Sequence, residues 1–370
     1  MISRKWLLWT LVFIFAAAVI TAGCGGSNTA QKPAQPDAAK LVTITTSNQP
    51  CVHALPNYMA MKKGWDKAEG LKIEYQFYPS GPPQNEALAS NKWEVGDMGA
   101  VPGMLACLRY NAYIIAISND ESITNDLWVR PNSPILQKKG VDPKYPNIYG
   151  SPADWKGKTI LLTTASTGHY AVIATLKALG LSEKDVKMVH MEQSQAMAAF
   201  EAGQGDIVQL WAPFDYIGES KGWKKVSSGQ AAGVMIPGVI VASKKAVDES
   251  PEKVAKWLKL YMRGLAEMKA NPKESAAILD AYYKEHGITL TESALMQEFT
   301  LRPTFNTQEQ LALFKKDGSA PSKVDVWMSD LAEFFVQQGR ITPEEKAQLL
   351  KGNHMTDKIM KMVAEQEAKK

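Results

Sequence analysis

The stretch from Trp155 to Phe214 constrains the fold of this chain more than any other part of the sequence. Short apolar runs typical of buried strands alternate in it with segments of helical spacing, in the order strand, helix, strand, helix, strand. Strands connected in this way form a parallel sheet, and ligands bind where polar residues collect at the carboxyl ends of such strands. The stretch therefore predicts an α/β lobe with a binding edge.

The first strand end in this stretch carries a candidate anion-binding turn. The apolar run Thr159–Thr163 is followed by Ser166, Thr167 and Gly168, and a helical pattern then continues until Gly180. Serine and threonine at this position can cap the free N–H groups of the helix, and the same N–H groups can bind an anion instead. Ser166 and Thr167 thus have two alternative roles, as helix caps or as ligands of an anion.

The segment before this stretch shows the same alternation, and the segment after it is helical. Strands are predicted at 41–47, 71–78, 95–99 and 113–118, with helices at 57–63, 84–91 and 102–111. A long helix begins at Pro251, further helices are predicted up to residue 350, and the charged tail from Lys358 is expected to fray. The isolated apolar runs Leu127–Arg130 and Val239–Ala242 are interpreted as two connections between lobes.

These patterns predict two α/β lobes, of which the first is discontinuous. Residues 41–131 and 237–370 are assigned to lobe 1, and residues 132–236 to lobe 2. A chain of 370 residues with 45% hydrophobic composition is long enough for two cores. The net charge of +4 is mild, and no basic run interleaved with aromatic residues indicates nucleic acid.

The N-terminus has the parts of a secretory signal. A basic start precedes an apolar segment from Trp6 to Ile20, which is short for a membrane span. Cys24 follows small residues as in a bacterial lipobox; an ordinary cleaved signal and an uncleaved anchor are the alternatives. We expect residues 1–23 to be a lipoprotein signal peptide, Cys24 to be lipidated, and residues 24–40 to form a flexible tether.

The remaining cysteines and the known catalytic motifs carry less information. Cys51 and Cys107 can pair in an exported protein or remain as two buried thiols. Cys51 and His53 have no second pair at metal-ligand spacing, so no metal is expected. The sequence has no Gly-x-Ser-x-Gly, no phosphate loop with lysine and no zinc-binding histidine pair, which disfavours an enzyme.

Several motifs follow one another in a characteristic order: Gln49-Pro50, Tyr78-Pro79-Ser80-Gly81, Val95-Gly96-Asp97-Met98-Gly99, Ser166-Thr167-Gly168-His169-Tyr170 and Trp211-Ala212-Pro213-Phe214. In order and spacing they resemble the bacterial ABC-transporter solute-binding proteins of the nitrate, sulfonate and taurine (bicarbonate) type, over nearly all of residues 41 to about 350. The resemblance implies an α/β periplasmic-binding-protein type II fold. Two lobes would be joined by a two-strand hinge, with the C-terminal helices packed on the first lobe.

The resemblance also implies a function. The chain would be the extracytoplasmic solute-binding component of an ABC importer, held at the cell membrane by its lipid anchor, in the periplasm or at the cell exterior. It would capture a small organic anion, an aliphatic sulfonate or a taurine-like compound, as a monomer without a cofactor, and deliver it to the permease with its ATPase. A ligand-sensing lipoprotein receptor domain and an enzyme on the same fold are the alternatives.

The same resemblance assigns the ligand-binding residues. From the first lobe they are Gln49, Pro50, His53, Tyr78, Ser80, Gly81, Gly99, Ala100 and Val101, and from the second lobe Ser166, Thr167, Gly168, His169, Gln193, Trp211 and Phe214. Backbone N–H groups and hydroxyls would hold the anion, so that no arginine is needed. Ala212 stands where relatives often carry an acid that can serve an ammonium group, and Asp215 or Glu192 is the candidate substitute.

Overall fold

The computed structural model of the chain describes residues 41–369, and the chain divides into the units 1–39 and 40–370. The predicted signal peptide, the lipidation site Cys24 and the tether therefore lie outside the described residues. No helix within residues 41–369 is long and apolar enough to cross a membrane.

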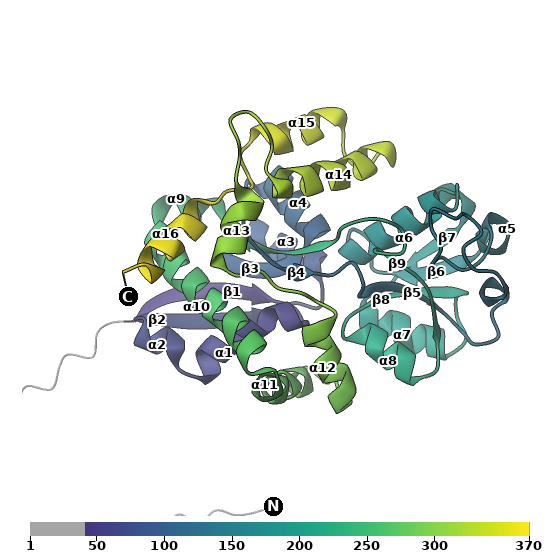
Figure 1. The fold of residues 1–370 in the computed structure, drawn as a ribbon, viewed down its shortest axis with the longest axis horizontal. Coiled ribbons are helices and arrows are strands. Elements are labelled where there is room, and N and C mark those ends of the chain that lie inside the picture. The colour runs from purple at the N-terminus through teal and green to yellow at the C-terminus, as the bar shows by residue number, and fades with distance from the viewer. Residues whose placement is uncertain (1–40, 370) are drawn as a thin grey trace, which may run out of the picture. The chain divides into compact units, whose positions relative to one another are not determined.

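The first lobe is built on a five-stranded sheet with the order β2-β1-β3-β10-β4 (Figure 1). β1 pairs in parallel with β2 and β3, whereas β10 is antiparallel to both β3 and β4. The strands are β1 (Val42–Asn48), β2 (Leu71–Phe77), β3 (Val95–Gly99), β4 (Tyr113–Asp120) and β10 (Pro237–Ala242). The sheet confirms the strands predicted before residue 120. Its remaining strand, β10, follows the second lobe in the sequence.

The second lobe contains the stretch that most constrained the fold. Its sheet has the order β7-β6-β8-β5-β9, in which β6 is parallel to β7 and β8, and β5 is antiparallel to β8 and β9. The strands are β5 (Asn125–Val129), β6 (Thr159–Leu162), β7 (Lys187–His190), β8 (Ile207–Trp211) and β9 (Lys224–Ser228). The predicted β-α-β-α-β unit is therefore present, and its three strands are parallel as expected.

The two apolar runs interpreted as connections between lobes lie inside the sheets, so that interpretation is wrong. Leu127–Val129 belongs to β5, which pairs with β8, and Val239–Ala242 belongs to β10, which pairs with β3 and β4. Both runs are apolar because both strands are buried, as in a sheet covered on both faces. The chain passes between the sheets in residues 121–124 and 229–236, and β5 precedes the predicted boundary at residue 131.

Helices cover both sheets, and most of the chain after β10 is helical. The helices before β10 are α1 (Leu55–Lys62), α2 (Trp65–Ala68), α3 (Gly81–Ala89), α4 (Ala100–Tyr110), α5 (Pro152–Trp155), α6 (Thr167–Ala178), α7 (Gln193–Glu201) and α8 (Phe214–Ser220). Those after it are α9 (Lys244–Glu249), α10 (Pro251–Ala270), α11 (Pro272–Glu285), α12 (Glu292–Thr300), α13 (Thr307–Phe314), α14 (Lys323–Gln337), α15 (Pro343–Lys351) and α16 (Lys358–Glu367).

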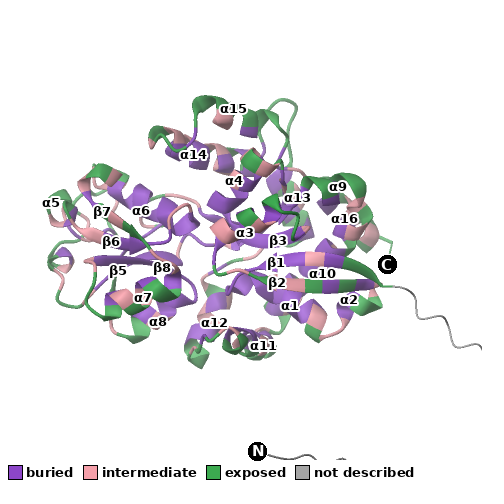
Figure 2. Cartoon of the chain, turned by 180° about the vertical axis from the view of Figure 1, so that it is seen from behind, coloured by how far each residue is buried: buried purple, intermediate pink, exposed green. Residues whose placement is uncertain are grey.

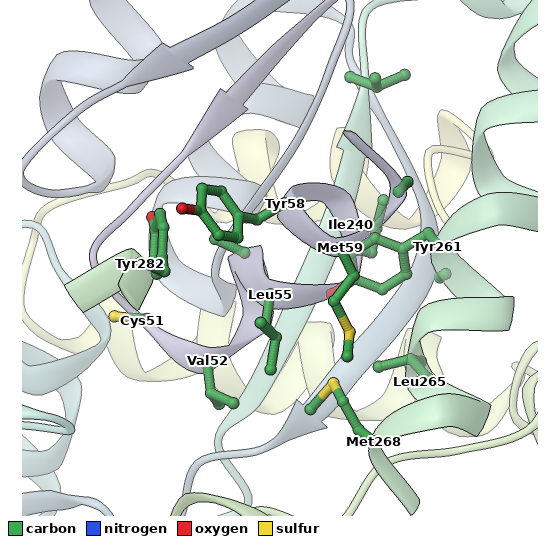
Figure 3. Packing of buried hydrophobic residues seen from close by; sticks show 14 of the residues in the cluster. Cys51, Val52, Leu55, Tyr58, Met59, Ile240, Tyr261, Leu265, Met268 and Tyr282 are labelled. Carbon is green, nitrogen blue, oxygen red and sulfur yellow. The ribbon is translucent and has the colours of Figure 1, made fainter. Parts of the chain in front are cut away.

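The long helix α10 packs against α1 and α16 in the core of the first lobe. Proline at its first position has no N–H group that would need a partner, and apolar residues at helical spacing give the helix one buried face. Figure 3 shows Tyr261, Leu265 and Met268 of this face beside Leu55 and Met59 of α1. The expectation that the tail from Lys358 frays is wrong, because α16 buries an apolar face on this core that its many charges hide in the sequence.

Two C-terminal helices also contact the second lobe. Ala294 of α12 packs with Ala212 and Tyr216, and Phe334 of α14 meets Tyr170 of α6 edge to face with a centroid distance of 5.1 Å. Figure 2 shows the faces that these helices turn inward as buried. The C-terminal helices are therefore packed on the first lobe, as expected, but α12 and α14 additionally cover two parts of the second.

Candidate functional site

A small cavity lies where strand ends of the two sheets face each other. Gln49 and Gly99 stand at the ends of β1 and β3, and Ser166 and Trp211 at the ends of β6 and β8. The complete lining is Gln49, Cys51, His53, Gly81, Gly99, Pro102, Glu121, Thr124, Asn125, Ser166, Thr167, Trp211 and Arg302. The volume of about 20 Å³ is room for a single water molecule, so an organic ligand enters only when the lobes move apart.

The lobes touch directly around this cavity. A Cβ atom on Gly99 would lie 1.8 Å from the Thr167 hydroxyl oxygen, so only glycine allows this approach of β3 to α6. The Ser80 hydroxyl donates to Oε1 of Glu192 across the lobes at 3.0 Å, and the thiol of Cys51 donates to the Ala212 carbonyl at 3.3 Å. These contacts describe a closed arrangement that opening of the lobes would break.

His53 is a buried cation at this site. Its Nε2 lies 3.1 Å from Oδ1 of Asp97, and its Nδ1 lies 3.1 Å from Oε1 of Glu121. Burial lowers the pKa of His53, but Asp97 and the other neighbours raise it more strongly, to about 10. The imidazole is therefore protonated at neutral pH and holds the two carboxylates together.

Arg302 is the second buried cation and was not predicted. It follows α12, and its guanidinium group contacts Glu121 and lies 3.3 Å from Oε2 of Glu298. Burial raises the pKa of Glu121, but Arg302 and His53 outweigh this effect, so the net pKa is lowered and the group is ionised. Burial raises the pKa of Asp97 to about 6 although His53 opposes it. Three carboxyl groups thus surround two cations, and burial raises the pKa of Glu298 as it does that of Asp97.

Several polar atoms in the cavity lining lack hydrogen-bond partners. Within residues 41–369, Nε1 of Trp211 and Oδ1 of Asn125 are buried without a partner, and no hydrogen bond engages the Thr167 hydroxyl. Leaving such a group unpaired costs about 1–3 kcal/mol, so their concentration in one cavity indicates a place for a polar ligand. Trp211 and Thr167 offer donors, and Asn125 offers an acceptor.

The hydroxyl of Ser166 is used by the fold. It accepts a hydrogen bond from the His169 backbone N–H at 3.2 Å and donates to the Thr163 carbonyl at 2.6 Å. Ser166 is thus the N-cap of α6, which was one of the two roles predicted for it. It also lines the cavity. A ligand would gain the hydroxyl as a donor only by taking it from Thr163.

Other predicted ligand residues lie outside the cavity lining and have partners within the protein. Nε2 of His169 lies 2.8 Å from Oε1 of Glu183, and the ring is fully buried. The side-chain carbonyl of Gln193 accepts from the Trp211 backbone N–H at 3.0 Å, and the Tyr78 hydroxyl donates to Gln76 at 2.7 Å.

The structure therefore brings together a part of the predicted set. The predicted residues that line the cavity are Gln49, His53, Gly81, Gly99, Ser166, Thr167 and Trp211. Those outside its lining are Pro50, Tyr78, Ser80, Ala100, Val101, Gly168, His169, Gln193 and Phe214. Sequence reasoning missed the inter-lobe residues Glu121, Thr124 and Asn125 because their segment was not recognised as a connection.

The structure also bears on the two cysteines and on possible metal sites. Cys51 and Cys107 are both buried and free, so the open question of their pairing is answered in favour of two thiols. Among residues 41–369, no group of His, Cys, Asp and Glu side chains has an arrangement that could hold a metal ion.

Comparisons with known proteins agree with this architecture. A family described as NMT1/THI5 like matches residues 144–275. A putative ABC transporter periplasmic binding protein of Brachyspira hyodysenteriae is 29% identical over 352 residues, covering 95% of this chain and 97% of that protein. A putative aliphatic sulfonates-binding protein of Bacillus subtilis is 27% identical over 331 residues, covering 85% of this chain and 92% of that protein.

Solved structures show the same fold. The alkanesulfonate-binding protein SsuA of Xanthomonas axonopodis pv. citri bound to MOPS has a TM-score of 0.66 and 18% identity, covering 84% of this chain and 99% of that chain. The desulfurization enzyme DSZB has a TM-score of 0.61 and 15% identity, covering 88% of this chain and 99% of that chain. The chain therefore has the two-lobed α/β fold of the periplasmic binding proteins. Its sequence relatives are periplasmic binding proteins of ABC transporters, which confirms the resemblance seen in the motifs.

Proposed function

We propose that this chain is the extracytoplasmic solute-binding component of an ABC importer. It captures a small organic anion, an aliphatic sulfonate or a taurine-like compound, between its lobes and delivers it to the permease with its ATPase. The observation that carries the proposal is a cavity lined by both lobes, where buried polar atoms have no partner. The names of the sulfonate-binding relatives support the choice of ligand.

The donors for the anion lie on the second lobe. The Thr167 hydroxyl, the indole N–H of Trp211 and the first N–H groups of α6 can hold an oxyanion, and the N-terminus of this helix adds roughly half a positive charge. Trp211 also covers an apolar body with its ring. These groups are neutral and directed, so they can bind a weakly basic sulfonate without a further cation.

A thermal-shift screen of the purified full-length chain tests this proposal. The panel contains alkanesulfonates, taurine, nitrate and bicarbonate, each added well above its dissociation constant. A ligand in hundredfold excess stabilises the folded chain by about 2.7 kcal/mol, which is a readily measured shift. The absence of a shift with every anion would contradict the proposal.

An enzyme is the second candidate, and one observation favours it. The thiol of Cys51 lies in the cavity lining next to His53, and the desulfurization enzyme DSZB has the same fold. Burial raises the pKa of Cys51 although His53 opposes it, so the reactive thiolate is disfavoured. We expect the bound compound to be recovered unchanged in mass spectrometry. Turnover of many equivalents per chain would establish the enzyme instead.

Replacing Ser166 with alanine separates its two roles. Loss of the N-cap is expected to lower the free energy of unfolding by about 1 kcal/mol in urea denaturation. Ser243→Ala is the matched control, because Ser243 caps α9 in the same way and is not among the residues that line the cavity. If Ser166 also binds the anion, only Ser166→Ala weakens binding, roughly ten- to a hundredfold. Equal affinity in both variants would leave Ser166 as a cap alone.

The lipid anchor is tested by replacing Cys24 with serine. The chain would then lack the thiol to which the diacylglycerol is attached, and the multi-chain anchor would be lost. We expect the variant to be released from the membrane or to accumulate as the unprocessed precursor. Fractionation with mass analysis of the N-terminus measures this. If the processed Cys24→Ser variant still sediments with membranes, the prediction that Cys24 carries the lipid anchor is contradicted.

A further inference from the structure

We propose that the chain has a second binding site, which takes a small carboxylic acid with an apolar body and a hydrogen-bond donor. The site is a pocket of about 340 Å³ between α3, α4, the turn before α6 and the end of α14. It shares no lining residue with the inter-lobe cavity, so it is distinct from the site that the proposed function uses.

The pocket forms where elements of both lobes and a C-terminal helix meet. α4 packs on α3 and on α6, and α14 packs on α4, as Figure 1 also shows. Leu105 of α4 and the buried Phe335 of α14 give the pocket apolar walls, and Ala165 of the turn before α6 reaches it from the second lobe. Its volume lies within the range of pockets that bind small molecules.

The charged groups of the pocket favour a monoanion. Within residues 41–369, the side chain of Arg109 forms no hydrogen bond or ion pair, while Nη2 of Arg340 donates to Oε1 of Glu183 at 2.8 Å and its other N–H groups stay available. Glu86 is the one acid among the described lining residues. Two arginines and one glutamate leave a single positive charge. A carboxylate would neutralise this charge, and its two oxygens match the paired N–H groups of a guanidinium.

Asn85 adds a buried acceptor that needs a donor. This lining residue is only 7% exposed, and its Nδ2 donates to the Pro102 carbonyl at 2.9 Å, whereas its Oδ1 is buried without a partner. An unpaired buried acceptor is unfavourable, and a hydroxyl group of a ligand would satisfy it. The side chains of Leu105, Tyr110 and Phe335 supply apolar surface for the body of such a ligand. The pocket therefore fits a hydroxylated acid.

The three isomers of hydroxybenzoate test this inference in calorimetry with the purified full-length chain. Each carries a carboxylate, an apolar ring and a hydroxyl group, and together they cover three spacings between charge and donor. At least one isomer is expected to bind. The matching hydroxybenzamide lacks the charge and is expected to bind roughly ten- to a hundredfold more weakly. Benzoate lacks the donor and is expected to bind about two- to tenfold more weakly.

Replacing Arg109 with methionine tests the seat of the carboxylate. The variant keeps most of the aliphatic stem, and it is expected to weaken the binding of the best hydroxybenzoate roughly ten- to a hundredfold. Arg263→Met is the matched control, because Arg263 is also an exposed arginine on a helix, lies over the ring of Trp65 and is absent from the pocket lining. The control has the same change in net charge and is expected to bind like the wild type.

Trp211→Ala separates this pocket from the inter-lobe cavity. Trp211 lines only the cavity, so the variant is expected to keep its affinity for the hydroxybenzoate once circular dichroism shows that it is folded. A loss of binding in Trp211→Ala without a loss in Arg109→Met would place the compound in the cavity and overturn the inference, while the proposed function would stand. The inference is also overturned if no isomer binds or if Arg263→Met loses as much affinity as Arg109→Met.

Discussion

Replacing Arg302 with methionine is expected to lower the free energy of unfolding by about 3–5 kcal/mol. The guanidinium group is buried between Glu121 and Glu298, and its removal leaves two carboxylates in the interior with only His53 to compensate them. Methionine keeps much of the volume, so the loss reports on charge and not on packing. Urea denaturation followed by circular dichroism at neutral pH measures it.

Arg340→Met is the control for this result. Arg340 also pairs with a glutamate, Glu183, at 2.8 Å, but its side chain is 40% exposed. An exposed pair contributes up to about 1 kcal/mol, because solvent screens it. Equal stabilities of the Arg302 and Arg340 variants would show that the buried pairs of Arg302 contribute no more to the free energy of unfolding than the exposed pair of Arg340.

The effect of Arg302 depends on pH with a defined sign. The pKa of Glu121 is lowered in the folded chain, so its contribution is present above its ordinary pKa of 4.5 and is lost as the pH falls below it. The difference in stability between the wild type and Arg302→Met is therefore expected to shrink below about pH 4.5.

Gly99→Ala is expected to prevent full closure of the lobes and so to raise the radius of gyration of the chain without ligand. The added Cβ would lie 1.8 Å from Oγ1 and 2.9 Å from Cβ of Thr167, so the lobes can close only if one of them shifts. Each lobe keeps its own core, and the variant should remain folded. Small-angle scattering without ligand measures this radius of gyration.

The double variant Gly99→Ala with Thr167→Gly provides the rescue. It removes the atoms of Thr167 that the new Cβ would meet, so the radius of gyration should return toward that of the wild type. Scattering is the proper readout, because Thr167 is itself a proposed ligand residue. An unchanged radius of gyration in Gly99→Ala would contradict the contact between β3 and α6.

The fold could be predicted where local signals and packing agree. β3 begins and ends at the predicted residues Val95 and Gly99, because the helical patterns on both sides limit the length of this short segment. α16 was missed since its lysines and glutamates outnumber the residues Ile359, Met360 and Val363, which pack on α10. Spacing, and not composition, carries the signal in such a helix.

Only one part of the candidate site, the free N–H groups at a strand end, could be predicted from the sequence. A strand that ends before a polar turn, as at Ser166, shows in the sequence that backbone N–H groups will be free there. The partners of these groups do not show: the Glu121 and Arg302 side chains are 181 residues apart and meet only in the folded chain. The pairing of His169 with Glu183 likewise depends on the folded structure, because the sequence around His169 does not show whether the ring contacts a ligand or another side chain.

The contacts of α12 and α14 with the second lobe have a consequence for the order in which the chain folds. The ribosome synthesises Tyr170, Ala212 and Tyr216 before the helices α12 and α14 that cover them, the first of which begins near residue 290. A nascent chain that stops short of these helices therefore exposes apolar surface on a lobe whose own strands are complete. Such a surface promotes aggregation until the last quarter of the chain has been released.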